Sequence, residues 1–108
     1  MSATPRTTVS ISYPQGTKFD MDYYLTKHMP LAQAKWAQYG LKGCKVVQYG
    51  GADGAPYSVQ SLLDFDSAEG WTRAVASPEA QDVMADVANF ADKRPSMWVG
   101  GTVKEESC

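Results

Sequence analysis

The chain has 108 residues, of which 44% are hydrophobic, and this length suits one domain with one core better than two domains. Ten Lys and Arg residues nearly balance twelve Asp and Glu residues, the formal net charge is -2, and the basic residues form no cluster. This charge pattern argues against binding to nucleic acid or to an anionic membrane surface. We therefore expect a single domain over residues 1–108.

The location of the protein is predicted from its apolar segments and its cysteines. The first ten residues lack the apolar run of a signal peptide, and no segment approaches the roughly 20 apolar residues that span a membrane. We expect a cytoplasmic protein with no membrane partner. The two cysteines, Cys44 and Cys108, fit reduced thiols of structural or incidental role better than a disulfide framework.

The first half of the chain predicts a strand followed by a long helix. Residues 7–13 alternate in polarity, and the apolar face of this strand would carry Val9, Ile11 and Tyr13. Asp20 can cap the next helix through its side-chain oxygen. We expect that helix to run to about Tyr39 and to end at Gly40, a residue that readily adopts the left-handed conformation.

Two further strands are predicted at residues 43–50 and 57–65, where they would pair as an antiparallel hairpin. The glycine-rich loop between them leads into a strand and not into a helix, so it predicts turn chemistry and no phosphate site. A short helix follows from a cap at Ser67, and Pro78 starts a second helical segment. The last strand is expected at residues 96–103.

The second helical block has an apolar stripe and an acidic side. The stripe comprises Ala80, Val83, Met84, Val87, Phe90 and Ala91. The opposite side comprises Glu79, Asp82, Asp86 and Asn89. We interpret the acidic side as a face in contact with solvent, and we expect no metal site there because no histidine or cysteine joins it.

The resulting order is βαββαβ, which predicts an α+β, ferredoxin-like domain with both helical layers on one face of an antiparallel sheet. The other face then needs a cover. Leu62 and Leu63 are adjacent in the third strand and point to opposite faces, so both faces carry apolar groups. A second copy stacked sheet to sheet would cover the free face, and we therefore expect a homodimer.

His28 is the only histidine, and at about 100° per residue it falls on the inward stripe of the first helix. That stripe comprises Met21, Leu25, His28, Ala32 and Tyr39. One interpretation is a core histidine held by a hydrogen bond. The other is a titratable group in an aromatic pocket. The aromatic residues that could converge there are Tyr13, Tyr24, Trp36, Tyr39, Tyr49, Trp71 and Trp98.

Pro30 lies two residues after His28 and removes the helical hydrogen bond to the carbonyl of Thr26. A kink is expected at this point. The kink would either open a gap between His28 and the sheet or only curve the helix around the sheet.

The segment FDMDYYLTKHMPL, residues 19–31, resembles the F-D-x-x-Y-Y-x-x-x-H-x-P-L motif of the EthD family, named for ethyl tert-butyl ether degradation. Residues 64–92 resemble the second helical block of that family. The resemblance implies a dimeric α/β barrel, in which two sheets close around each other and each subunit has a pocket between sheet and helices. Of the motif residues, His28 carries over best, together with Tyr24 and Tyr23.

Relatives in the wider superfamily include isomerases, polyketide cyclases, cofactor-free monooxygenases and haem-degrading enzymes, and the fold alone does not choose among them. We predict cofactor-independent acid/base chemistry by His28, with Tyr24 orienting the imidazole or donating to an oxyanion. This would make the protein a cofactor-free lyase, isomerase or monooxygenase-like enzyme. The predicted substrate-binding residues are Tyr13, Trp36, Tyr49, Trp71 and Trp98.

The predicted substrate is a small hydrophobic or aromatic metabolite with a carbonyl or phenolic group. Two alternatives stay open. One is a dimer that binds a hydrophobic ligand, or assists an oxygenase, without chemistry of its own. The other is haem binding through His28, since imidazole is a common axial ligand.

Overall fold

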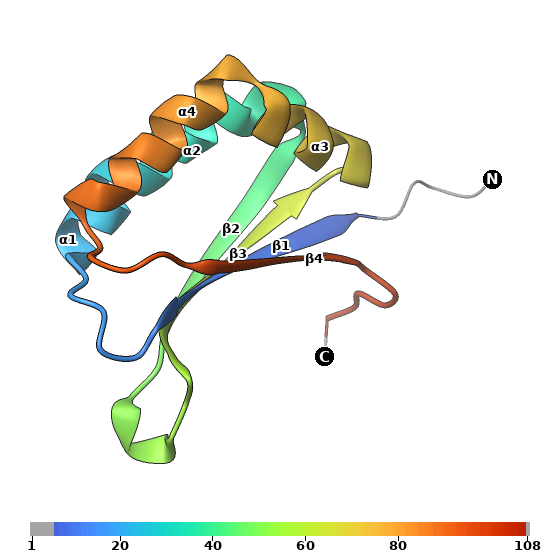
Figure 1. Ribbon diagram of the computed structural model, residues 1–108. Coiled ribbons are helices and arrows are strands. Elements are labelled where there is room, and N and C mark those ends of the chain that lie inside the picture. Colours follow the sequence, from blue (N-terminus) through green and yellow to red (C-terminus); the bar gives the residue numbers. More distant parts are fainter. Residues whose placement is uncertain (1–5, 108) are drawn as a thin grey trace.

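A four-stranded antiparallel sheet forms the base of the molecule, with strand order β2-β3-β1-β4. The structure is a computed structural model and describes residues 6–107. The strands are β1 (Thr7–Pro14), β2 (Leu41–Gln48), β3 (Tyr57–Phe65) and β4 (Ser96–Gly101). The helices between β1 and β2 and those between β3 and β4 lie together on one side of this sheet (Figure 1). This is the predicted α+β, ferredoxin-like arrangement, and it is confirmed.

The register of the strands separates two sheet faces. Val9 of β1 pairs with Leu63 of β3 and with Val99 of β4, and this row points toward the helices. The neighbouring row, in which Ser10 pairs with Leu62 and Trp98, points the other way. The predicted inward face of β1 is confirmed, and Val9 and Tyr13 are buried.

The first helical region begins and ends where its sequence signals predict, but it is not one regular helix. Its segments are α1 (Met21–Tyr23), the π-helix η1 (Tyr24–His28), α2 (Met29–Trp36) and the 3₁₀ helix η2 (Ala37–Tyr39). The carboxylate of Asp20 accepts a hydrogen bond from the backbone N–H of Tyr23, and Gly40 ends the region with φ of 99°. The cap and the terminator are thus confirmed.

The π-turn ends two residues before Pro30 and changes which residues point inward. Pro30 has no N–H for the carbonyl of Thr26, and the N–H of Met29 instead reaches the carbonyl of Tyr24, five residues back. The helix therefore has more residues per turn at this point. The prediction that Leu25 points inward is wrong, since its side chain is 49% exposed, while Tyr24 and His28 are buried.

The second helical block consists of α3 (Ala68–Ala76), α4 (Pro78–Ala85) and the 3₁₀ helix η4 (Asp86–Asn89). Ser67 caps α3 by accepting from the N–H of Gly70, and Pro78 opens α4 as predicted. Gly70 has no room for a side chain because the carbonyl of Tyr39 lies against its Cα. This close approach is one of the contacts between the two helical regions, and α2 also packs against α4.

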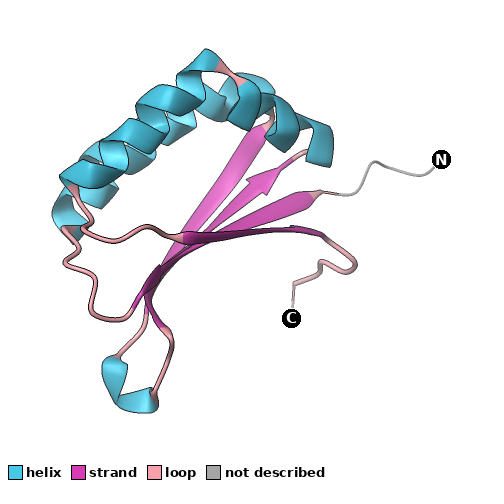
Figure 2. Ribbon diagram, viewed as in Figure 1, coloured by secondary structure: helices cyan, strands magenta, loops and turns pink. Residues whose placement is uncertain are grey.

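The strand β4 has little cover within the chain. The helical layer lies over one face of the sheet only (Figure 2), and all six residues of β4 are exposed. The exposed fractions of Met97, Trp98 and Val99 are 42%, 66% and 52%. A short 3₁₀ helix, η3 (Gly51–Asp53), stands in the loop between β2 and β3. Its position within a hairpin loop agrees with the predicted turn.

The predictions about membrane segments and about the two cysteines can be compared with the described residues only. Within the described part of the chain, no helix is long and apolar enough to cross a membrane. Cys44 is a half-buried free thiol, and burial raises its pKa. Cys108 lies outside the described residues.

Candidate functional site

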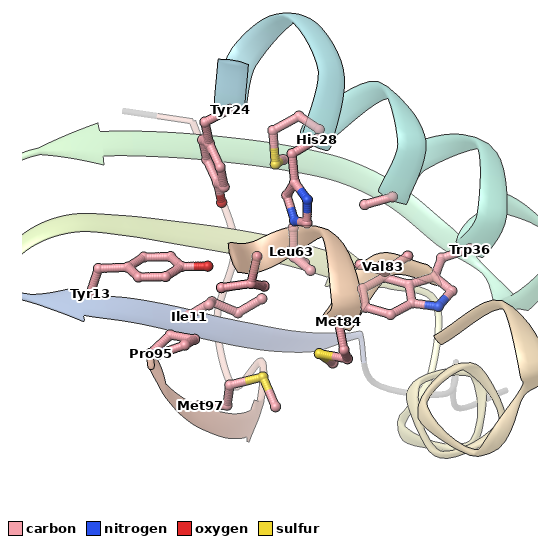
Figure 3. Close-up of a pocket in the computed structure, with 13 residues that line it drawn as sticks. Ile11, Tyr13, Tyr24, His28, Trp36, Leu63, Val83, Met84, Pro95 and Met97 are labelled. Carbon is pink, nitrogen blue, oxygen red and sulfur yellow. The ribbon is translucent and has the colours of Figure 1, made fainter. Parts of the chain in front are cut away.

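A cavity lies between the helical layer and the sheet, and His28 forms part of its wall (Figure 3). Its lining is apolar apart from this imidazole and two tyrosine hydroxyls. The lining residues are Ile11, Tyr13, Tyr24, His28, Met29, Ala32, Trp36, Leu63, Val83, Met84, Val87, Pro95 and Met97. The centre of a water molecule can move through about 30 Å³ of this space. In this conformation the cavity therefore has room for water-sized occupants only.

His28 is buried, with 6% of its surface exposed, and aromatic rings surround it. The phenol ring of Tyr24 stacks on the imidazole with a centroid distance of 5.3 Å and 18° between the planes. The ring of Phe90 lies tilted against the imidazole at a centroid distance of 4.4 Å. These rings hold the imidazole plane in one orientation at the cavity wall.

Among residues 6–107, the buried imidazole has one polar partner, which comes from η4. The Nδ1 atom of His28 lies 2.9 Å from Oδ2 of Asp86. The other carboxylate oxygen of Asp86, Oδ1, accepts the hydroxyl of Tyr23 at 2.6 Å and the side-chain amide of Asn89 at 2.9 Å. All three groups thus converge on the carboxylate of Asp86.

The interpretation of Asp86 as a solvent-facing residue is wrong, because only 12% of its side chain is exposed. Asp82 does fit that interpretation, since its side chain is 64% exposed and pairs with Lys35 at 3.4 Å. The difference arises because α4 ends at Ala85 and a 3₁₀ turn follows. A 3₁₀ helix has about 3.0 residues per turn, so a wheel drawn at 100° per residue misplaces the side chains of this turn.

The electrostatics of the pair favour a neutral imidazole beside an ionised carboxylate. Burial lowers the pKa of His28 below its usual 6.5, and the neighbouring Asp86 carboxylate offsets only part of that shift. Burial raises the pKa of Asp86, but hydrogen bonds from Tyr23, Asn89 and His28 outweigh it, and the pKa is lowered overall. The imidazole therefore carries one proton at neutral pH.

The two tyrosines of the cavity differ in their hydrogen bonding. The hydroxyl of Tyr24 forms a short hydrogen bond with the hydroxyl of Ser61 on β3. Burial raises the pKa of Tyr24 to about 12. Tyr13 reaches from β1 toward the same space, and burial raises its pKa as well (Figure 3). Both phenols are therefore neutral at physiological pH and can donate a proton in a hydrogen bond.

The structure brings together four of the seven residues predicted for the site. His28, Tyr24, Tyr13 and Trp36 line the cavity. The benzo part of the Trp36 indole lies toward the cavity in Figure 3, and its Nε1 is buried without a hydrogen-bond partner in the described part of the chain. The same indole makes an edge contact with the ring of Trp71.

The other three predicted residues do not line the cavity. Trp71 is a core residue that packs between Trp36 and Phe65. The hydroxyl of Tyr49 bonds to Gln60 in the exposed part of the hairpin. Trp98 stands on β4, in the row that points away from the helices. Sequence patterns place an aromatic residue on an element, but they do not say which way a sheet row or a hairpin end faces.

The same geometry bears on the binding of haem and of metal ions. A space of about 30 Å³ beside His28 does not admit a porphyrin in this conformation. Within residues 6–107, no three His, Cys, Asp or Glu side chains lie close enough together to hold a metal ion. The acidic side of the second helical block therefore forms no such group in that part of the chain.

The fold and the cavity define a small α+β, ferredoxin-like protein with one imidazole in an apolar pocket. The family model of the EthD domain matches residues 14–94 of the sequence. This range includes η1 and η4, and it includes all the cavity residues except Ile11, Tyr13, Pro95 and Met97. The chain belongs to the EthD family.

Three relatives illustrate the similarity. An uncharacterized 11.0 kDa protein from the thcB-thcC intergenic region of Rhodococcus erythropolis is 35% identical over 90 residues, which cover 80% of this chain and 82% of the relative. An EthD-like protein from Ralstonia eutropha has a TM-score of 0.82 and 28% identity, with 96% of this chain and 97% of that chain covered. SnoaB, a cofactor-independent oxygenase from Streptomyces nogalater, has a TM-score of 0.70 and 10% identity, with 95% and 97% covered. At that identity, the likeness to SnoaB concerns the fold alone.

Proposed function

We propose that this protein is a small cofactor-independent enzyme in which His28 moves a proton on a small hydrophobic or aromatic metabolite. The substrate carries a carbonyl or phenolic oxygen, and the reaction is of the isomerase, cyclase, decarboxylase or monooxygenase type. Degradation of ethers or aromatic compounds is the setting that we propose. The observation that carries this proposal is the position of the chain's only imidazole, neutral and buried, in the wall of an apolar cavity.

A neutral imidazole suits this chemistry because it can accept a proton and return it near neutral pH. Positioned acid/base groups of this kind contribute typically about 10²- to 10⁴-fold to a rate. Tyr24 supports the site as the ring that stacks on His28, and its hydroxyl is engaged by Ser61. Tyr13 supplies a second phenol at the cavity, where it can donate to an oxygen of the substrate.

The lining favours an uncharged substrate. No Lys or Arg stands among the thirteen lining residues, so a substrate carboxylate would lose its hydration without gaining a partner. The cavity must widen to admit such a molecule. Met84 and Met97 line it, are 39% and 42% exposed, and have flexible side chains that can move aside.

The test is proton exchange in heavy water, which needs no knowledge of the natural reaction. The protein is incubated with a panel of small aromatic ketones and hydroxylated aromatics, and NMR follows exchange of the protons next to the carbonyl or the hydroxyl. The wild-type protein should speed exchange in at least one compound, and His28→Phe should bind that compound without speeding exchange. Equal exchange rates with and without wild-type protein across the panel would contradict the proposal.

The second candidate is a non-catalytic protein that binds a hydrophobic ligand or assists an oxygenase system. The apolar lining of the cavity supports this candidate, because such a lining can hold a hydrophobic ligand without any chemistry. In that case His28→Phe should bind the same ligands as the wild-type protein, and neither should exchange their protons.

We also propose that the protein works as a cytoplasmic homodimer. The exposed apolar residues of β4, on both of its faces, support pairing with a second copy. The free thiol of Cys44 suits a reducing compartment.

A further inference from the structure

We propose that Asp86 is a positioning residue that fixes the tautomer of His28, with the proton on Nδ1 and the lone pair on Nε2 directed to the cavity. The catalytic consequence rests on the proposed function, in which Nε2 is the base. The tautomer itself is a property of the resting protein and can be measured without any substrate.

The first step is the contact between the two side chains. An ionised carboxylate has no proton to donate and only accepts hydrogen bonds. With 2.9 Å between Nδ1 and Oδ2, the imidazole must therefore be the donor. A neutral imidazole has one N–H, so placing it on Nδ1 leaves Nε2 as an acceptor. No group within residues 6–107 makes a hydrogen bond to Nε2, which is the nitrogen left for a ligand.

The second step is the support of the carboxylate from its other side. The Tyr23 hydroxyl and the Asn89 amide both donate to Oδ1, at 2.6 and 2.9 Å. Tyr23 comes from α1 and Asn89 from η4, so two elements hold the carboxylate in one orientation. Oδ2 is left facing His28. Such a chain of support is how a partner group sets the orientation and the tautomer of an imidazole.

The two oxygens of the Asp86 carboxylate have different partners, since Oδ1 accepts two hydrogen bonds and Oδ2 faces His28. In Asp86→Asn, the amide oxygen should take the Oδ1 position, because two donors already point there. The amide NH₂ then faces Nδ1 of His28, and it can bond only if Nδ1 carries the lone pair. The imidazole proton should therefore move to Nε2. The substitution keeps the shape of the side chain and reverses the tautomer.

Asp82→Asn is the matched control. Asp82 lies four residues before Asp86 on the same helical block, but its side chain is exposed and its partner is Lys35. It loses the same charge without touching His28. Any effect of net charge alone appears equally in both variants.

The experiment is ¹⁵N NMR of the imidazole in the intact protein at a pH where His28 is neutral. Because the chain has one histidine, the two ring nitrogens give two assignable signals. The wild-type protein and Asp82→Asn should show a protonated Nδ1 and an unprotonated Nε2. Asp86→Asn should show the reverse, with most of the population changed.

The proposal is overturned if the wild-type imidazole carries its proton on Nε2, or if Asp86→Asn has the same tautomer as the wild type. Should Asp86→Asn fail to fold, the wild-type spectrum alone decides between the two tautomers. A wild-type Nδ1–H tautomer combined with no proton exchange in heavy water would refute the proposed function while leaving the positioning role intact.

Discussion

The phenol ring of Tyr24 stacks on the imidazole of His28, with 5.3 Å between the ring centres and 18° between their planes. The two residues are one turn apart on the π-helix η1, and the hydroxyl of Tyr24 points past the imidazole to Ser61. Tyr24 is therefore a platform for His28 that is itself fixed to β3. The stack contributes to the burial of the imidazole, and burial is the main cause of its lowered pKa.

The hydrogen bond between Tyr24 and Ser61 should stabilise the folded protein. Tyr24→Phe keeps the stacked ring but leaves the Ser61 hydroxyl buried without its partner, which should cost about 1–3 kcal/mol. Tyr24→Phe combined with Ser61→Ala should recover part of that loss, because neither polar group is left unpaired. Urea unfolding of the two single variants and the double variant measures the coupling. If the double variant loses as much unfolding free energy as the two single variants together, the hydrogen bond between Tyr24 and Ser61 does not stabilise the protein.

Stability should fall on acidification in two pH windows. The pKa of His28 is lowered in the folded state, so below 6.5 the unfolded chain binds a proton more readily than the folded one, and stability is lost as the pH falls toward the folded pKa. Asp86 also has a lowered pKa, so its contribution is present above 3.8 and is lost below that value. Urea unfolding between pH 8 and 5 should show the first loss in the wild type and not in His28→Gln. If the wild-type protein became more stable as the pH fell from 8 to 5, the pKa of His28 would not be lowered in the folded state.

Filling the cavity should abolish ligand binding. Ala32 is buried and lines the cavity, so Ala32→Leu places a larger side chain in it, at a cost of about 1–3 kcal/mol if the core overpacks. Phenol or a small aromatic ketone should raise the melting temperature of the wild type and not that of this variant. Ala34→Leu, on the exposed side of the same helix, is the control and should respond like the wild type. An unchanged response in Ala32→Leu would place the ligand elsewhere.

The exposed strand β4 should be the site of self-association. Sedimentation should give a mass of twice the 11.8 kDa chain for the wild type, and Trp98→Arg should shift the protein toward the monomer. Val75→Arg, a similarly apolar exposed position on the helical layer, serves as control and should keep the dimer. A wild-type protein that stays monomeric at high concentration would exclude this role for β4.

The order of the elements could be predicted because each element has a local signal. The Asp20 cap, the Ser67 cap, Pro78 and Gly40 mark helix boundaries, and alternation in β1 marks its buried face. These signals depend on neighbouring residues only. The bounds of β3 agree with the prediction, while β2 and β4 differ at their ends, where pairing partners decide the last residue.

The partner of His28 could not be predicted because a local irregularity determines it. A wheel of regular α-helical pitch places His28 inward but Asp86 in solvent, whereas Asp86 begins a 3₁₀ turn after Ala85 and its carboxylate lies against His28. Asp86 and His28 are 58 residues apart, and no sequence pattern links them. The only trace of the contact in the sequence is a pair of polar residues, Asp86 and Asn89, spaced for one side of a 3₁₀ turn.

Whether the cavity holds a base at neutral pH depends on the protonation of one side chain. A pH titration of His28 by NMR, which its uniqueness in the chain makes unambiguous, measures this directly. The pKa should lie below 6.5, and it should fall further in Asp86→Asn, because the carboxylate raises the pKa and its removal leaves the effect of burial unopposed. A pKa at or above 6.5 in the wild type would mean an imidazole in contact with solvent or largely protonated near neutrality, and the proton-transfer role assigned to it would have to be given up.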